Sequence, residues 1–449
     1  MKFNLLLICL FICLSYTEDT SPNPGIMGAL KLSFINKLKD ENFNNFINEV
    51  NNMTIPNMKE KKLRLENIHL QVNIPSSNNI ELSFDESSNG LKVILRNIST
   101  NLSLKWKKKI LFKIKGKFHV KGEFDKIELI LGFNTQIKDG FIIPSVYTKS
   151  ASIDIDKHKW KADFGHKNIA NEIGNVILRI LRGKGIKLIK KECMKQLEKK
   201  IPNIINKGIL KKYKTEGSLT PWLSLSLANT GPINVNKDYL ALPIDGTIFL
   251  VEDGYNKTIK SSEIPLVPTT TNNDIVLVAG RYSFKTLETS MNKLDFEYYT
   301  KADKLDVRIF IPGNNKSYSI TNTATGLHVK VKGTLTLVES RMSIDIEISA
   351  NVTMSLSNGD ENEMFYLNPE IVKNSINIKT SNVAFVKQKL GLSLLTPLFD
   401  PIIEYFTNKI KLKSVPVKKL DDSKLLCKVK KNDVKFSPKY AQVELSFTN

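Results

Sequence analysis

Residues 104–124 of this 449-residue chain read LKWKKKILFKIKGKFHVKGEF. From Phe112 onward the apolar residues alternate with lysines, and successive side chains of a β-strand point to opposite faces of its sheet. A period of two with lysines on one face predicts an antiparallel strand with one face in water and the other on a core. The fold is therefore expected to rest on long strands with two different faces.

The same alternation returns in the second half of the chain. It runs over residues 327–337 and again over residues 342–356. The second run keeps its parity for about fifteen residues, which is long for a strand of a globular protein. Shorter alternation passes through Ile153 and Ile155.

Other stretches have helical spacing. The first predicted helix covers residues 26–50 and begins with apolar residues four apart: Ile26, Leu30, Phe34 and Leu38. A second apolar stripe runs through residues 169–205, and Gly183, Gly185 and Pro202 predict breaks or kinks in it. Further helices are expected near residues 284–294 and over about residues 386–410.

Each half thus reads helix, long strands, apolar helix, strand. We predict an α+β fold in which each half is a highly twisted antiparallel sheet wrapped against two long helices. Gly231, Pro232 and Pro243 mark a connector between the halves. The predicted divisions are a signal peptide (1–19), a basic N-terminal barrel (21–228), a connector with a central sheet (229–250) and a C-terminal barrel (251–449).

The first residues predict export. Met1-Lys2 is followed by an apolar run from Leu5 to Leu14, shorter than the roughly 20 residues that cross a bilayer. We interpret it as a secretory signal peptide cut between Ser15 and Thr20, the alternative being a short buried helix. The protein is expected to be secreted, either outside the cell or into the lumen of granules or vacuoles.

Cysteines and sequons fit that expectation. Two of the four cysteines lie in the leader, and Cys193 and Cys427 are too few for a disulfide scaffold. No disulfide can form within the N-terminal barrel, because Cys193 is its only cysteine. Six Asn-x-Ser/Thr sequons are candidate glycosylation sites: Asn52, Asn97, Asn101, Asn256, Asn315 and Asn351.

The net charge of +21 is uneven. Residues 21–230 hold 37 Lys and Arg against 19 Asp and Glu, whereas residues 231–449 hold 28 against 24. An anionic partner is therefore expected at the first half, and nucleic acid, heparin-like glycans and anionic lipids all qualify on charge alone.

The sequence has no recognisable catalytic or metal-binding motif. The five histidines form no metal-binding spacing, and no nucleophile elbow or phosphate-binding loop occurs. Nearby lysines could activate Cys193, but we interpret it as structural. We predict no enzyme activity, no cofactor and no metal.

Three short motifs carry a family resemblance through their order. Asn23-Pro24-Gly25 leads directly into the first helix, Ile55-Pro56-Asn57 precedes a basic cluster, and Leu104–Lys113 holds a Lys-Trp-Lys segment. This order resembles the family of bactericidal/permeability-increasing protein, lipopolysaccharide-binding protein, and the phospholipid and cholesteryl ester transfer proteins. The helix with Glu192-Cys193 is similar to the family's long helix with its single cysteine. The resemblance spans essentially the whole mature chain.

The resemblance implies a boomerang of two barrels joined by a central sheet. Each barrel would hold phospholipid acyl chains in an apolar pocket, and the basic tip of the N-terminal barrel would bind lipopolysaccharide. One departure is clear: the family bridges its helix cysteine to a preceding strand, and residues 141–155 contain no cysteine here. Whether Cys193 is free, pairs with Cys427 or pairs between chains stays open.

The implied sites can be named in this sequence. Headgroup contacts are expected from Lys59, Lys61, Lys62, Arg64, Lys105, Trp106, Lys107, Lys108, Lys109 and Lys113. Acyl-chain contacts are expected from Ile26, Leu30, Phe34, Leu38, Ile173, Ile177, Leu394, Leu398 and Ile402.

The headgroup site depends on a hairpin that turns at Lys107–Lys109, with the basic cluster at residues 59–64 in a neighbouring loop. The alternative is a solvated strand face that only keeps a barrel soluble. Trp106 would lie at a membrane interface or, in phase with Leu104, in the core.

Three functions are compatible with this sequence. They are an innate-defence binder of anionic bacterial lipid, a lipid-transfer or carrier protein, and an unrelated basic binder, for example of glycans. We favour a monomer that binds phospholipid and lipopolysaccharide or another anionic membrane surface, and no nucleic acid.

Overall fold

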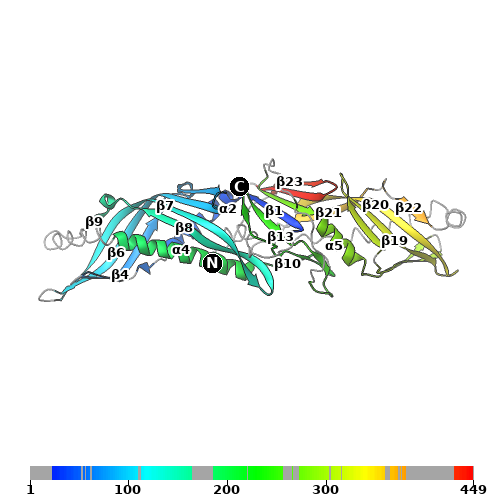
Figure 1. Cartoon of the computed structure of the whole chain (residues 1–449), viewed down its shortest axis with the longest axis horizontal. Coiled ribbons are helices and arrows are strands. Elements are labelled where there is room, and N and C mark those ends of the chain that lie inside the picture. The colour runs from blue at the N-terminus through cyan, green and yellow to red at the C-terminus, as the bar shows by residue number, and fades with distance from the viewer. Residues whose placement is uncertain are drawn as a thin grey trace.

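The molecule is elongated, with a central sheet and one wing on each side of it (Figure 1). The computed structural model describes residues 23–51, 54–55, 57–60, 63–109, 113–163, 186–219, 221–255, 265, 273–302, 305–314, 316–358, 365–372, 375, 377–380 and 429–447. Within that part of the chain, no helix is both long and apolar enough to cross a membrane.

The N-terminal wing is an eight-stranded antiparallel sheet. Its path runs β2 (Thr54–Ile55), β4 (Leu63–Asn73), β6 (Gly90–Lys109), β7 (Lys113–Lys138), β8 (Phe141–Asp154). Three short strands pair beside this path: β3 (Met58–Glu60) with β4, β5 (Ile80–Asp85) with β6, and β9 (Lys161–Asp163) with β7. Helices α2 (Leu32–Asn51) and α4 (Ile186–Lys212) contribute residues to the cluster on its inner face.

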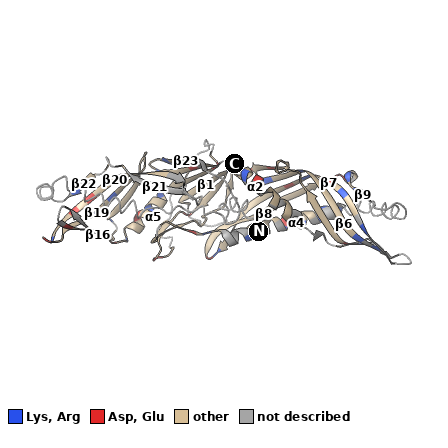
Figure 2. Ribbon diagram, turned by 180° about the vertical axis from the view of Figure 1, so that it is seen from behind, with Lys and Arg blue, Asp and Glu red and all other residues tan. Residues whose placement is uncertain are grey.

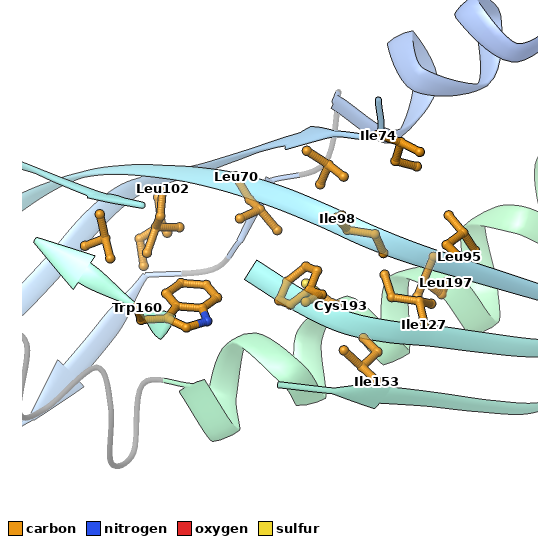
Figure 3. Packing of buried hydrophobic residues seen from close by; sticks show 14 of the residues in the cluster. Leu70, Ile74, Leu95, Ile98, Leu102, Ile127, Ile153, Trp160, Cys193 and Leu197 are labelled. Atoms are coloured by element: carbon orange, nitrogen blue, oxygen red, sulfur yellow. The ribbon is translucent and has the colours of Figure 1, made fainter. Parts of the chain in front are cut away.

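The predicted two-faced strands are confirmed in this wing. Leu102, Leu104 and Val120 are buried in the inner cluster, whereas Lys105 and Lys121 are exposed. Trp160 is fully buried against Phe124, with ring centroids 6.0 Å apart, and points into the cluster with Cys193 from α4 (Figure 3). Gly122 makes room for the indole, because an added Cβ would lie 2.4 Å from the ring.

The central sheet joins distant parts of the chain. Its order is β12 (Asn234–Val235), β13 (Tyr239–Ile244), β1 (Ile26–Lys31), β15 (Ile275–Gly280), β24 (Tyr440–Phe447), β23 (Val429–Phe436). The predicted connector, residues 229–250, supplies β12 and β13, and the other four strands come from outside it.

The prediction of one helix from residue 26 is wrong for its first turn and a half. Residues 26–31 form β1 between β13 and β15, and α2 begins only at Leu32. Gly28, Ala29 and Leu30 are buried in succession, so β1 is covered on both faces, and a short apolar run of this kind does not distinguish a strand from a helix. Gly28 suits the strand, since an added Cβ would meet Leu242 at 3.0 Å.

The C-terminal wing repeats the plan with a seven-stranded sheet. Its path is β16 (Phe296–Ala302), β17 (Leu305–Ile311), β19 (Leu327–Leu337), β20 (Met342–Asn358), β21 (Phe365–Ile371). β18 (Tyr318–Asn322) pairs with β19, and β22 (Asn377–Thr380) pairs with β20. A small sheet consists of β10 (Glu216–Ser218), β11 (Leu223–Ser226) and β14 (Ile248–Leu250). Its leucines pack in one apolar cluster with buried residues of β17, β19 and β20.

The helix predictions have mixed outcomes. α5 (Arg281–Met291) confirms the helix expected near residues 284–294. α4 runs continuously through Pro202, which excludes a break there, and the alternative of a kink stays a prediction. The stripe at residues 169–181 and the helix at 386–410 lie outside the described residues. The fold class, α+β with two curled antiparallel sheets joined by a central one, is confirmed.

An asparagine closes one edge of each wing. The Asn206 side chain on α4 accepts a hydrogen bond from the Val146 N–H (2.7 Å) and donates to the Val146 carbonyl (2.8 Å). Asn292, after α5, does the same for Tyr318 of β18, at 2.7 and 2.9 Å. Each amide thus replaces a missing neighbour strand.

We predict that Asn206→Ala lowers the free energy of unfolding by about 1–3 kcal/mol, because both Val146 backbone groups lose their partner in a buried site. The measurement is urea denaturation followed by tryptophan fluorescence. Asn203→Ala, at an exposed position of the same helix, is the control. Equal losses in the two variants would contradict the edge-closing role.

Candidate functional site

Basic residues occupy opposed register positions on four strands of the N-terminal sheet. Lys59 on β3 lies opposite Arg64 on β4, Arg64 opposite Lys107 on β6, and Lys107 opposite Lys115 on β7. Neighbouring strands are about 4.8 Å apart, so this row spans about 15 Å. Directly opposed like charges destabilise a sheet. A row of four is therefore unfavourable unless an anion faces it.

Further lysines extend the row in both directions along the strands. Lys105 lies opposite Lys117, Lys109 opposite Lys113, and Lys121 opposite Asn101. We define the outer cationic face as these basic positions: Lys59, Arg64, Lys105, Lys107, Lys109, Lys113, Lys115, Lys117 and Lys121. Figure 2 shows Lys and Arg along the distal strands of this wing.

One acid, Glu66, neutralises part of the outer cationic face. Glu66, with a side chain only 16% exposed, contacts Lys107 and lies 3.6 Å from the Arg64 guanidinium. Lys105 and Lys117 are exposed, and neither makes an ion pair in the described part of the chain. Surface pairs of this kind contribute at most about 1 kcal/mol to stability.

The C-terminal wing offers an internal comparison. On the corresponding strands β19 and β20, Lys330 and Lys332 both approach Glu347, at 3.5 and 3.7 Å. On β16 and β17, Arg308 pairs with Glu297. A strand face that only needs to be soluble thus mixes its charges in this protein. On the outer cationic face Glu66 pairs with Arg64 and Lys107 in the same way, but exposed Lys105 and Lys117 make no ion pair in the described part of the chain, and this excess of cations favours an anion-binding surface.

Two expectations about the basic segment are wrong. β6 and β7 remain paired as far as Lys109 opposite Lys113, so the chain does not turn at Lys107–Lys109. The basic cluster is not a loop, because Lys59 and Arg64 pair with each other on β3 and β4. Lys61 and Lys62 lie outside the described residues.

The register also divides the predicted headgroup residues. Lys105, Lys107, Lys109 and Lys113 share the parity of the outer face, whereas Trp106 and Lys108 share that of buried Leu104. The side chains of Lys59, Trp106, Lys108, Lys109 and Lys113 are not described. Lys115, Lys117 and Lys121 are absent from the predicted headgroup site, although their alternation with apolar residues predicts the lysine face for them too.

The acyl-chain prediction remains a prediction. Leu30 and Phe34 are 3% exposed and lie in the core cluster between the wing and the central sheet, and half-buried Ile26 packs against it. The other predicted contacts fall outside the description: the Leu38 side chain, Ile173, Ile177, Leu394, Leu398 and Ile402.

The cysteines and the sequon asparagines are the remaining residues named in the sequence predictions. Cys193 is 6% exposed in the apolar cluster, as a structural cysteine should be, and Cys427 lies outside the described residues. Asn97 and Asn101 are exposed, whereas Asn351 is half-buried and hydrogen-bonded to His328 Nδ1 at 2.9 Å. Asn52, Asn256 and Asn315 are not described.

Fold and surface together define a class: a two-winged α+β protein whose N-terminal sheet presents a cationic outer face. No protein-family model matches the chain, and neither does any curated protein sequence. Among solved structures it is similar to the crystal structure of lipopolysaccharide binding protein, with a TM-score of 0.55 and 14% identity over 95% of this chain and 99% of that one. The sequence resemblance is thus confirmed at the level of the fold.

We predict that Glu66→Gln strengthens retention on a heparin column, because it removes the acid that faces Lys107 and Arg64. Glu81→Gln, on β5, is the control. It makes the same charge change beside a different cation, Arg96, whose Nε lies 2.6 Å from the Glu81 carboxylate. The salt concentration at elution is the measurement. Stability should change by less than about 1 kcal/mol in either variant. Equal shifts would show that only net charge matters.

Proposed function

We propose that this chain is a secreted, non-enzymatic lipid-binding protein that binds lipopolysaccharide or another anionic lipid through the outer cationic face, in antibacterial defence. The observation that carries the proposal is the row Lys59–Arg64–Lys107–Lys115, in which basic residues occupy directly opposed register positions on four strands. An anionic surface removes their mutual repulsion.

The chemistry of the face suits lipid headgroups. Eight of its nine positions are lysines, and an ammonium binds phosphate as a point charge without the fixed geometry of arginine. A basic residue near an anionic membrane contributes about 1 kcal/mol, so several acting together give firm binding. A sheet face presents them to a surface at once, whereas a pocket would select a single headgroup.

The interior would hold acyl chains. The inner side of the N-terminal sheet is apolar from Leu70 to Leu102 and Val120, and both helices that pack on it are apolar there. Burial contributes roughly 0.8 kcal/mol per methylene, so a phospholipid would be held without catalysis. The likeness to lipopolysaccharide binding protein supports this part of the proposal.

The alternative is an extracellular lipid-transfer protein with no antibacterial role. It is favoured by the lysine-rich composition of the outer cationic face. Lysines bind any surface with a high density of negative charge, and such a surface need not contain lipopolysaccharide. The two functions differ in whether lipid leaves the protein at a second membrane.

We predict that replacing Lys105, Lys107, Lys117 and Lys121 by Gln weakens binding to lipopolysaccharide and to phosphatidylglycerol vesicles at least a hundredfold. Four charges at about 1 kcal/mol each give this loss if they roughly add. Each substitution should change stability by no more than about 0.5 kcal/mol. Vesicle cosedimentation and thermal unfolding are the measurements.

The matched control replaces Lys316, Lys332, Lys379 and Lys439, all exposed and outside the N-terminal wing, by Gln. It changes net charge equally and should bind nearly as the wild type does. If both quadruple variants lose affinity alike, the outer cationic face is not a site.

A second prediction concerns the interior. The purified protein should release phospholipid when it is denatured and extracted, in an amount of at least one molecule per chain by mass spectrometry. The quadruple variant of the outer face should release the same amount, because acyl binding depends on buried area. A lipid-free extract would favour a basic binder of another kind, such as a glycan-binding protein.

A further inference from the structure

Two histidines that are 50 residues apart in the sequence meet in one row of the N-terminal sheet. His69 on β4 lies opposite Ser103 on β6, and Ser103 lies opposite His119 on β7. A bulge in β4 between Glu66 and His69 brings His69 into this register. Both imidazoles are exposed. They stand about 10 Å apart, two strand spacings, on the outward side of the sheet.

Their surroundings are basic on almost every side. On β7, Lys117 and Lys121 flank His119 on the same face, and on β6 Lys105 lies diagonal to both histidines. On β9, Asp163 lies opposite His119 and Lys161 opposite Lys121. On β4, Glu66 precedes the bulge, and on β2 the neutral Thr54 lies opposite His69. The histidine row therefore continues the outer cationic face.

We propose that His69 and His119 make anionic-lipid binding by the outer cationic face acid-strengthened. This inference rests on the proposed function of that face. An imidazole ordinarily gains its proton as the pH falls from about 7.5 to 5.5, and it then carries a positive charge. Two added charges attract an anionic surface more strongly. By linkage, binding to that surface takes up protons.

The sign of the effect is fixed by this chemistry. Protonation adds positive charge to a positive face, so affinity for anions rises as the pH falls. Near an anionic membrane one charge changes affinity about fivefold, and two change it by up to about 25-fold. The lysines of the face set the binding that remains at pH 7.5. The protein would hold membrane most firmly in an acidic compartment or at an acidified surface.

The experiment measures binding of the full chain to vesicles of phosphatidylglycerol and phosphatidylcholine at pH 7.5 and 5.5. Ionic strength is held constant, because salt screens surface charge. The wild type should bind up to about 25-fold more tightly at pH 5.5. A His69→Gln/His119→Gln variant should match the wild type at pH 7.5 and lose most of the gain at pH 5.5. His158→Gln, at an exposed position of η2 (Lys157–Lys159) outside the row, should keep the full gain.

A charged variant supplies the converse test. His69→Lys/His119→Lys should bind at pH 7.5 as the wild type does at pH 5.5, with no further gain on acidification. The inference is overturned if the wild type shows no pH dependence, if the Gln variant keeps it, or if the Lys variant is no tighter at pH 7.5. If the wild type binds the vesicles at neither pH, the proposed function itself is wrong. The quadruple lysine variants test that function separately, because they change no histidine.

Discussion

Strand β6 pairs with β7 over nearly its whole length, from Gly90 opposite Gly132 to Lys109 opposite Lys113. Because strand side chains alternate between faces, this single register decides both sides of the N-terminal wing. It places Leu102, Leu104 and Val120 in one buried cluster and Lys105, Lys117 and Lys121 in water. A slip by one residue would put the lysines into the core, so the apolar cluster holds the cationic surface in place.

The opposed basic residues of the N-terminal wing therefore reduce the stability of its strand pairing. A ladder of opposed lysines weakens strand pairing, and the inner face offsets this with large buried side chains such as Trp160, seated on Gly122. The C-terminal wing has the same plan of long strands but answers Lys330 and Lys332 with Glu347. One architecture thus carries two kinds of surface, and the charge pattern distinguishes the wings.

Much of this could be predicted from the sequence. Alternation over residues 112–124 and 327–356 gave the long strands, because a period of two has no helical interpretation. Residues 26–31 were misjudged because a strand buried on both faces loses its alternation. The row Lys59–Arg64–Lys107–Lys115 and the row His69–Ser103–His119 depend on register between distant strands. The pattern within one strand does not determine its register against a strand far away in the sequence. The one-residue bulge in β4 shifts this register further, and no local pattern predicts the bulge.

The central proposal is that the outward side of the N-terminal sheet lies against anionic lipid. Lysine footprinting tests it without any substitution: the chain is acylated with a small amine-reactive reagent, alone and on phosphatidylglycerol vesicles, and each lysine is read by peptide mass spectrometry. Lys105, Lys117 and Lys121 should lose reactivity on the vesicles, while exposed Lys316, Lys379 and Lys439 keep theirs. Protection of the second group, or none in the first, would contradict the account.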